Sequence, residues 1–501
     1  ITTKRSQDTQ GGLITVLGGD QERLIAGARY GGKVGDDVFY RAYVKYENHA
    51  AFTGGNDAWE ISRAGFRTDW TPNRETSVTV QGDIYDGEEH GLHQVASFNP
   101  PFTTQFQAPT FVHGGNVLAR FDHSFGSDVQ LQAQTYWDRT GRLAVPLNET
   151  RDTFDLDLQL RFPTFAGQKI TVGAGYRWTG DQTEGSFSAT LDPADRRADV
   201  ASTFIQDEIP IVENVLILTV GSKFEYNNYT HFEDEPGARI SWHPAERHTV
   251  WASASRAVRT PSEFEEDVIA NPQVLPPVPP SPFPNDVRFM GDHAFKSEVL
   301  RAYEMGYRTR PIDPLILDAA VFFNDYYRLR TSQQGVPFPE GGPPPTDVVV
   351  PLSAANQMEG HTYGAELAAT WQVQETVRVY GAYTFLRMHL HEIQNSTDSS
   401  AQTEERSSPR NLVYLRGSWE PVKDVTFDLI GRYMDSIPAW NVRHYVEMDA
   451  RLGWMVTRNL EAAIVGQNLL HASHFETTNS QIGNPATQVE RSGYFSLTWR
   501  F

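Results

Sequence analysis

Paired histidines are the first side chains of this 501-residue chain whose spacing could support chemistry. His90 and His93 flank a Gly-Leu pair, and imidazole nitrogens at that spacing could ligate a metal ion or a haem iron from a loop. Two further pairs have a comparable spacing, His389 with His391 and His471 with His474. Because solvated surface histidines show the same spacing, we predict neither a metal site nor a bound cofactor.

A run of acidic residues is the second candidate for chemistry. It contains Glu263, Glu265, Glu266 and Asp267 and lies in a proline-rich segment. Carboxylates this close together could act in acid–base catalysis or bind a cation, but charged residues among prolines are typical of a solvated loop. The sequence contains no cysteine, no His-Glu-x-x-His motif and no phosphate-binding glycine loop. We therefore predict no catalytic residue and no enzymatic activity.

Aromatic rings and basic side chains are better candidates for binding a ligand. Stacking and charge would let them hold a bulky anionic or aromatic molecule. One group precedes a predicted loop at residues 329–357, and another follows a short predicted loop at residues 436–441. The candidate ligand-binding residues are His90, His93, Arg259, Tyr326, Tyr327, Arg330, Trp440, Arg443 and His444.

The elements that must position these residues have a period of two. In one segment the residues that share a face are Leu315, Leu317, Ala319, Val321 and Phe323. Residues 376–386 and the end of the chain repeat the alternation, with polar side chains on the second face. This pattern indicates strands that contact lipid on one side and a polar lumen on the other. A half-buried soluble sheet alternates in the same way, so the connection lengths must decide.

The connections alternate between short and long from the second one onward. About 22 strands can be counted, with short turns such as residues 32–36 and 71–75 and tight hairpins at residues 20–21 and 227–230. Long loops are predicted near residues 47–57, 87–112, 181–196, 257–296, 329–357, 390–408 and 468–488. These lengths predict an all-β fold, a transmembrane antiparallel up-and-down β-barrel with short periplasmic turns and long extracellular loops. Because the strand number is even, both termini lie at the same end of the barrel. We predict that this is the short-turn end, in the periplasm.

Composition excludes several classes of protein. The chain has no stretch approaching the roughly 20 consecutive apolar residues that a membrane-spanning helix needs. A net charge of −20 argues against nucleic acid as a partner, because phosphate binding requires clustered Lys and Arg. The lack of cysteine excludes a disulfide framework and a thiolate metal site.

Several segments resemble known proteins. Leu497, Trp499 and Phe501 occupy alternate positions at the end of the chain, and this ending resembles the signal read by the bacterial barrel-assembly machinery. Five further segments resemble TonB-dependent outer-membrane receptors in the order and spacing of that family: Ser255-Arg-Ala-Val-Arg-Thr-Pro-Ser-Glu-Phe-Glu265, Ser297-Glu-Val-Leu-Arg-Ala-Tyr-Glu-Met-Gly-Tyr-Arg308, Tyr363-Gly-Ala-Glu-Leu367, Pro409-Arg-Asn-Leu412 and Val465-Gly-Gln-Asn-Leu-Leu-His471. The resemblance covers essentially the whole chain.

The resemblance implies a receptor in the bacterial outer membrane that takes up a scarce ligand, a ferric siderophore or another iron complex, with energy from the TonB system. Residues 1–4 resemble the end of the family's plug domain. We therefore interpret residues 1–11 as the remnant of a plug-to-barrel junction and residues 12–501 as the barrel, and expect the plug, the TonB box and the signal peptide to be absent from this chain.

The implied partners are the iron complex, outer-membrane lipid and lipopolysaccharide, TonB through the missing plug segment, and the barrel-assembly machinery through the C-terminus. Two alternatives stay open, a passive diffusion pore and a cell-surface binding barrel without transport. The ligand is also open, with haem, cobalamin, copper, nickel and oligosaccharides as further possibilities.

Overall fold

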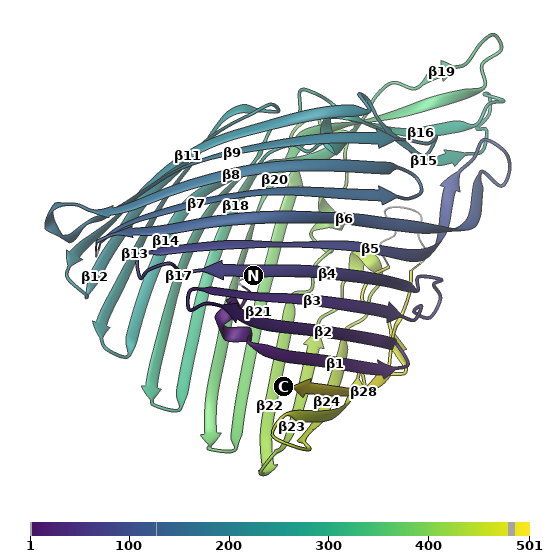
Figure 1. The fold of residues 1–501 in the computed structure, drawn as a ribbon. Helices are drawn as coiled ribbons and strands as arrows, with labels where there is room; N and C mark the ends of the chain where they lie inside the picture. The colour runs from purple at the N-terminus through teal and green to yellow at the C-terminus, as the bar shows by residue number, and fades with distance from the viewer. Residues whose placement is uncertain (1–2, 127, 479–485) are drawn as a thin grey trace.

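Strands make up most of the chain. This computed structural model describes residues 3–126, 128–478 and 486–501. Within those ranges, 22 antiparallel strands form a closed barrel (Figure 1). The predicted fold class and strand number are confirmed.

The barrel strands are β1 (Gly11–Gly19), β2 (Glu22–Val34), β3 (Val38–His49), β4 (Trp59–Trp70), β5 (Thr76–Ala96), β6 (Thr103–Phe125), β7 (Val129–Leu143), β8 (Asn148–Pro163), β9 (Lys169–Glu184), β11 (Asp195–Val212), β12 (Leu216–Asn227), β13 (His231–Ala245), β14 (His248–Arg259), β17 (Glu298–Ile312), β18 (Leu315–Gln334), β20 (Asp347–Gln374), β21 (Val377–Glu392), β22 (Asn411–Val422), β23 (Val425–Met434), β24 (Tyr445–Met455), β25 (Leu460–Gln467) and β28 (Ser492–Arg500). The sheet is extended within the connections by β10 (Ala189–Leu191), β15 (Val268–Leu275), β16 (Asn285–Met290) and β19 (Phe338–Glu340). A separate small sheet pairs β26 (Ser473–His474) with β27 (Val489–Glu490).

The helical elements are short: η1 (Ser6–Thr9), η2 (Phe165–Gly167), α1 (Glu263–Asp267), α2 (Ala401–Glu404) and η3 (Pro438–Trp440). Of the helices in the described part of the chain, none has the length and hydropathy needed to cross a membrane.

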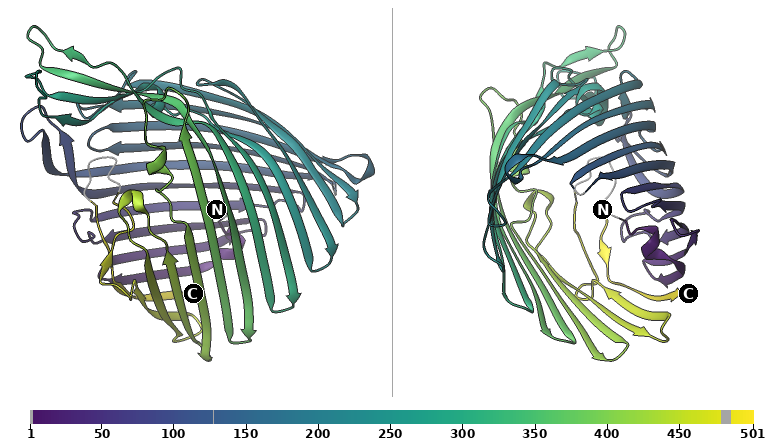
Figure 2. Two further views of the ribbon diagram at one scale, coloured as in Figure 1. Left: turned by 180° about the vertical axis from the view of Figure 1, so that it is seen from behind. Right: turned by 60° about the vertical axis from the view of Figure 1, so that its left-hand side comes forward.

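Pairing between the first and last strands closes the barrel. β1 pairs antiparallel with β2 on one side and with β28 on the other, so that Ile14 faces Trp499 and Val16 faces Leu497. The seam ends where Gly12 and Phe501 exchange two backbone hydrogen bonds, with N–O distances of 2.6 and 3.0 Å. The first strand therefore begins, and the last ends, at the end of the barrel that carries the short turns (Figure 2).

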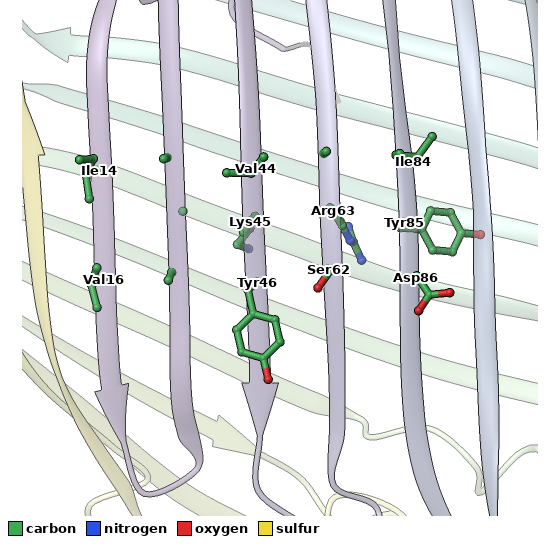
Figure 3. Close-up of a pocket in the computed structure, with 14 residues that line it drawn as sticks. Ile14, Val16, Val44, Lys45, Tyr46, Ser62, Arg63, Ile84, Tyr85 and Asp86 are labelled. Carbon is green, nitrogen blue, oxygen red and sulfur yellow. The ribbon is translucent and has the colours of Figure 1, made fainter.

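Side chains on the outer face of the wall form an apolar band. Side chains of a strand alternate between its two faces, so Leu317, Val321 and Phe323 share one face of β18, each between 36% and 48% exposed. Figure 3 views this outer side over β1 to β5, where alanines such as Ala26 and Ala64 line a shallow hollow of about 640 Å³. The predicted alternation is confirmed.

The lumen side of the wall is polar and charged. Arg177 donates to Asp155 over 2.9 Å, and Arg308 donates to Asp318 over 2.6 Å. The second pair borders a hollow of about 870 Å³ that is also lined by Glu366. Fixed charge pairs of this kind suit a water-filled interior rather than a packed core.

Two predicted loops are much shorter in the structure. β5 and β6 continue as a paired hairpin and leave only residues 97–102 as the connection, where a loop over residues 87–112 was predicted. β18 and β20 likewise leave residues 335–346 instead of 329–357, and β19 occupies part of that connection. Both predictions were wrong because these strands extend past the apolar band, where their side chains turn polar and look like loop residues. The tight hairpins at residues 20–21 and 227–230 are confirmed.

The seam between β1 and β28 supplies a test of closure. A Cβ atom at Gly12 would lie 2.2 Å from the Phe501 ring, so we expect Gly12→Val to displace that ring and cost about 1–3 kcal/mol of stability. At Gly431 an added Cβ atom would have no other atom within 4 Å, so Gly431→Val is the matched control. Urea unfolding of both variants in detergent checks this. Equal unfolding midpoints for Gly12→Val and Gly431→Val would contradict the expectation that the packing of Phe501 over Gly12 stabilises the closed barrel.

Candidate functional site

A short acidic helix, α1, lies in the connection between β14 and β17, at the long-loop end of the barrel. Ser262 precedes it and forms a capping box, in which its backbone N–H donates to the Glu265 carboxylate over 2.9 Å. Acidic side chains in a first turn also interact favourably with the unpaired N–H groups there. Local sequence therefore explains why a helix begins after Ser262.

The acidic side chains of α1 are buried, which contradicts the predicted solvated loop charge. Glu263, Glu265, Glu266 and Asp267 are between 2% and 8% exposed. An isolated carboxylate would not leave water, but each of these is paired with an arginine. Arg259 immediately precedes the helix, but Arg151, Arg196 and Arg330 project inward from strands that are distant in sequence, and the sequence alone did not reveal these pairings.

Arg196 of β11 is the central partner of α1. Its Nη2 lies 2.6 Å from Glu266 Oε2, and its Nη1 donates to Asp267 Oδ2. The same guanidinium lies 4.7 Å from the ring centroid of Tyr229. Burial raises the pKa of Tyr229 to about 12, so this ring stays neutral beside the charged cluster.

Glu263 belongs to a second group on α1. Arg151 of β8 forms an ion pair with Asp181 of β9 and lies 3.7 Å from the Glu263 carboxylate. Burial and the neighbouring Asp181 carboxyl raise the pKa of Glu263 to about 8. At neutral pH Glu263 is therefore mostly protonated in the folded chain, and α1 carries less negative charge than its sequence implies.

Two of the predicted ligand-binding arginines meet at Glu265. Arg259 lies 3.1 Å and Arg330 lies 3.5 Å from the same Oε1 atom of Glu265. Arg259 also donates to Glu298 over 2.7 Å. The two arginine side chains are 46% and 47% exposed, so each guanidinium keeps an open side that could bind an anionic group.

A second buried carboxylate organises the segment after β25. Glu447 is fully buried and accepts a hydrogen bond from Leu470 over 3.3 Å, while His471 Nδ1 lies 2.5 Å away. The His474 ring packs 4.4 Å from the ring of Tyr445, and its side chain is only 9% exposed. Both rings lie beside the Glu447 carboxylate, but only His474 is largely buried, since the His471 side chain is 48% exposed.

The sequence also matches a known family. Residues 7–469 match the family model described as TonB dependent receptor-like, beta-barrel. The chain belongs to this family. It is consequently an outer-membrane protein of Gram-negative bacteria, and its family consists of receptors and transporters rather than enzymes.

Solved structures share the fold of this receptor barrel. The siderophore receptor PirA from Pseudomonas aeruginosa is 15% identical, with 100% of this chain and 82% of that chain covered and a TM-score of 0.69. A variant of the ferric enterobactin receptor PfeA from the same organism, in complex with enterobactin, is 14% identical over 100% and 82% of the two chains, with a TM-score of 0.75. The siderophore receptor PiuA from Acinetobacter baumannii is 14% identical over 98% and 82%, with a TM-score of 0.73. A search of curated proteins found no match.

The first predicted histidine pair does not form a joint site in the receptor barrel. His90 and His93 lie on β5, not in a loop, and residues three apart on a strand face opposite sides. His90 lies 3.7 Å from Glu88, whereas His93 is 7% exposed and lies 3.3 Å from the carbonyl oxygen of Ala108. The possibility that these two histidines ligate one metal ion is therefore excluded.

Tyr326 and Tyr327 are also separated by the wall. Tyr327 shares the outer face with Arg301, whose guanidinium lies 4.9 Å from its ring centroid, while Tyr326 faces the lumen. A bulge follows them, where Arg328 has a φ of 58°, and beyond it Arg330 reaches Glu265.

The remaining predicted residues lie together at the start of β24. Trp440 ends η3, and its carbonyl oxygen accepts a hydrogen bond from Thr478. Arg443 and His444 follow and are exposed. They border the segment that Glu447 anchors, so this group is kept as a second candidate for ligand contact. Sequence reasoning missed Arg151, Arg196 and Asp181, for which only their lumen-facing strand positions could have been a signal.

The raised pKa of Glu263 predicts a pH dependence for the packing of α1. The folded chain holds a proton that the unfolded chain releases near the ordinary pKa of 4.5. The contribution to stability is therefore complete below pH 4.5 and is lost as the pH rises through about 8. Hydrogen exchange of residues 262–268, corrected for the intrinsic rate, should show less protection at pH 9 than at pH 6.

Glu263→Gln should remove most of that difference, because the amide cannot ionise. Glu340→Gln is the matched control, since Arg288 lowers the pKa of Glu340 and keeps it ionised throughout this range. An undiminished pH difference in Glu263→Gln would contradict the assignment of the proton to this residue.

Proposed function

We propose that this receptor barrel takes up a ferric siderophore or a related iron complex, with energy from the TonB system. The observation that carries the proposal is the pair of half-exposed guanidinium groups, Arg259 and Arg330, that α1 holds at one end of a TonB-dependent receptor barrel. Ferric siderophores are bulky and often anionic or aromatic, and guanidinium groups bind such molecules by charge, hydrogen bonding and stacking. The siderophore receptors with the same fold support this ligand class.

The long-loop end faces the outside of the cell in this proposal, and the short turns and both termini face the periplasm. Outer-membrane barrels generally have short periplasmic turns and long extracellular loops, and the connections of this chain have that asymmetry. Arg259, Arg330 and α1 then meet a ligand arriving from outside.

The ligand contacts Arg259 and Arg330, with Tyr326 on the same side of β18. Trp440, Arg443 and His444 form a second contact region, and His93 lines the wall of the β5 and β6 hairpin. His90 and Tyr327 are not included, because they occupy the outer face. This arrangement combines charged and aromatic side chains at the long-loop end of the barrel.

Passage through the lumen is gated by a plug segment on which TonB acts. A barrel of about 22 strands encloses a lumen too wide for its own side chains to fill. Residues 1–11 form the junction to such a segment, and residues 12–501 form the barrel. Ser6 of η1 donates its backbone N–H to buried Asp69 over 2.7 Å, which supports a fixed junction on the lumen side.

Two partners act through the outer wall and the C-terminus. Outer-membrane lipid and lipopolysaccharide contact the apolar band, and the assembly machinery reads Leu497, Trp499 and Phe501. These three side chains share the outer face and are 40–56% exposed in the finished barrel.

Binding of ferric complexes to the purified chain tests the proposal. The chain is titrated with ferric enterobactin, a ferric hydroxamate and haem, and binding is monitored by quenching of tryptophan fluorescence. At least one of the complexes should show saturable binding. The double variant Arg259→Ala/Arg330→Ala should bind that complex more weakly. The affinity should fall at least about 10-fold for each charged hydrogen bond that is lost. Arg301→Ala, on the outer face, is the matched control and should leave the affinity unchanged.

Conductance distinguishes the rival functions. A steady, unselective current through planar bilayers, with no saturable binding of any complex, would replace the proposal with a passive pore. High affinity for a macromolecule together with no uptake of iron complexes by cells would favour a surface-binding barrel.

A further inference from the structure

A tight turn after β16 brings His293 to the end of α1. Gly291 lets the turn lie directly against the backbone of α1, since a Cβ atom at this position would lie 2.3 Å from the backbone carbonyl carbon of Glu266. The N–H of Asp292 then donates to the carbonyl oxygen of Glu265 over 2.8 Å. The backbone of the turn therefore fixes the position of His293.

His293 meets two buried carboxylates. Its Nδ1 lies 3.4 Å from Glu266 Oε2, and its Nε2 lies 3.6 Å from Asp267 Oδ1. One donor atom from each residue lies within 4.8 Å of the other two. Ligands bound about 2.0–2.2 Å from one tetrahedral zinc ion lie about 3.3–3.6 Å apart, so side-chain movements of roughly 1 Å would bring all three donors to one ion.

One carboxylate oxygen lacks a hydrogen-bond donor. Asp267 Oδ2 accepts from Arg196, but Asp267 Oδ1 has no hydrogen-bond partner among the described residues, although the side chain is only 1% exposed. Leaving a buried acceptor unpaired is costly. This oxygen is directed toward His293, which is 69% exposed and could open a path from solvent.

The charges around the turn favour a cation. Glu263 is largely protonated, and Glu265 is neutralised by Arg259 and Arg330. Among the described residues, Arg196 is the one arginine that pairs with Glu266 and Asp267, so two buried carboxylates share one guanidinium charge.

We propose that Glu266, Asp267 and His293 bind one divalent transition-metal ion of the zinc class. Two carboxylate oxygens and one imidazole nitrogen are ligands that zinc accepts, whereas calcium and magnesium prefer oxygen alone. The ion clamps the turn at residues 290–294 to α1. Its binding is separate from the uptake of an iron complex, and it revises the sequence-based prediction that no metal site is present.

Calorimetric titration of the purified, chelator-stripped chain with ZnCl₂ tests the site. One zinc ion should bind per chain, and CaCl₂ should bind at least about 10-fold more weakly. His293→Ala should lower the zinc affinity at least about 10-fold. The barrel should survive this change because the imidazole is mostly exposed, and circular dichroism verifies that.

His391→Ala is the matched control, because His391 is an exposed histidine that lies 3.2 Å from one carboxylate, Glu359. It should leave zinc binding unchanged. Asp267→Asn should weaken zinc binding as His293→Ala does. The proposal is overturned if zinc does not saturate a single site, if His293→Ala binds zinc like the unaltered chain, or if calcium binds as tightly as zinc.

Discussion

Lipid offers the backbone no hydrogen-bond partner, so each N–H and C=O group of a membrane-spanning wall must pair with a neighbouring strand. β1 and β28 meet this requirement by pairing with each other, and the seam ends at the two hydrogen bonds between Gly12 and Phe501. Because the wall is closed, every strand has one side toward lipid and one toward the lumen. The period-two pattern of the sequence is the direct result.

The same closed wall concentrates charge at its long-loop end. Inward-facing Arg151 and Arg196 belong to strands on one side of α1, while Arg259 and Arg330 reach it from the other. A helix with four acidic residues can therefore be buried without being unpaired. Removal of water strengthens these charge pairs. It also raises the free-energy cost of a buried charge that lacks a partner.

The balance of charge around α1 bears on both the proposed metal site and the proposed ligand contacts. The proton on Glu263 and the guanidinium of Arg196 offset part of the negative charge, and the two carboxylates that share Arg196 lie near His293. On the other side of α1, Glu265 holds two arginines that retain exposed surface. One short helix thus presents a cation-attracting side and an anion-attracting side at the mouth of the receptor barrel.

Sequence alone determined the architecture, because side-chain alternation and connection length are local properties that a barrel wall between lipid and water requires. The sequence could not determine where strands end beyond the apolar band. The outer part of the β5 and β6 hairpin, within residues 87–112, was therefore wrongly predicted to be a loop. Sequence reasoning also misjudged the acidic run at α1, whose partner Arg196 lies 70 residues from Glu266 in the chain. Only the tertiary structure decided which charges meet, because strand register and bulges set the direction of each side chain.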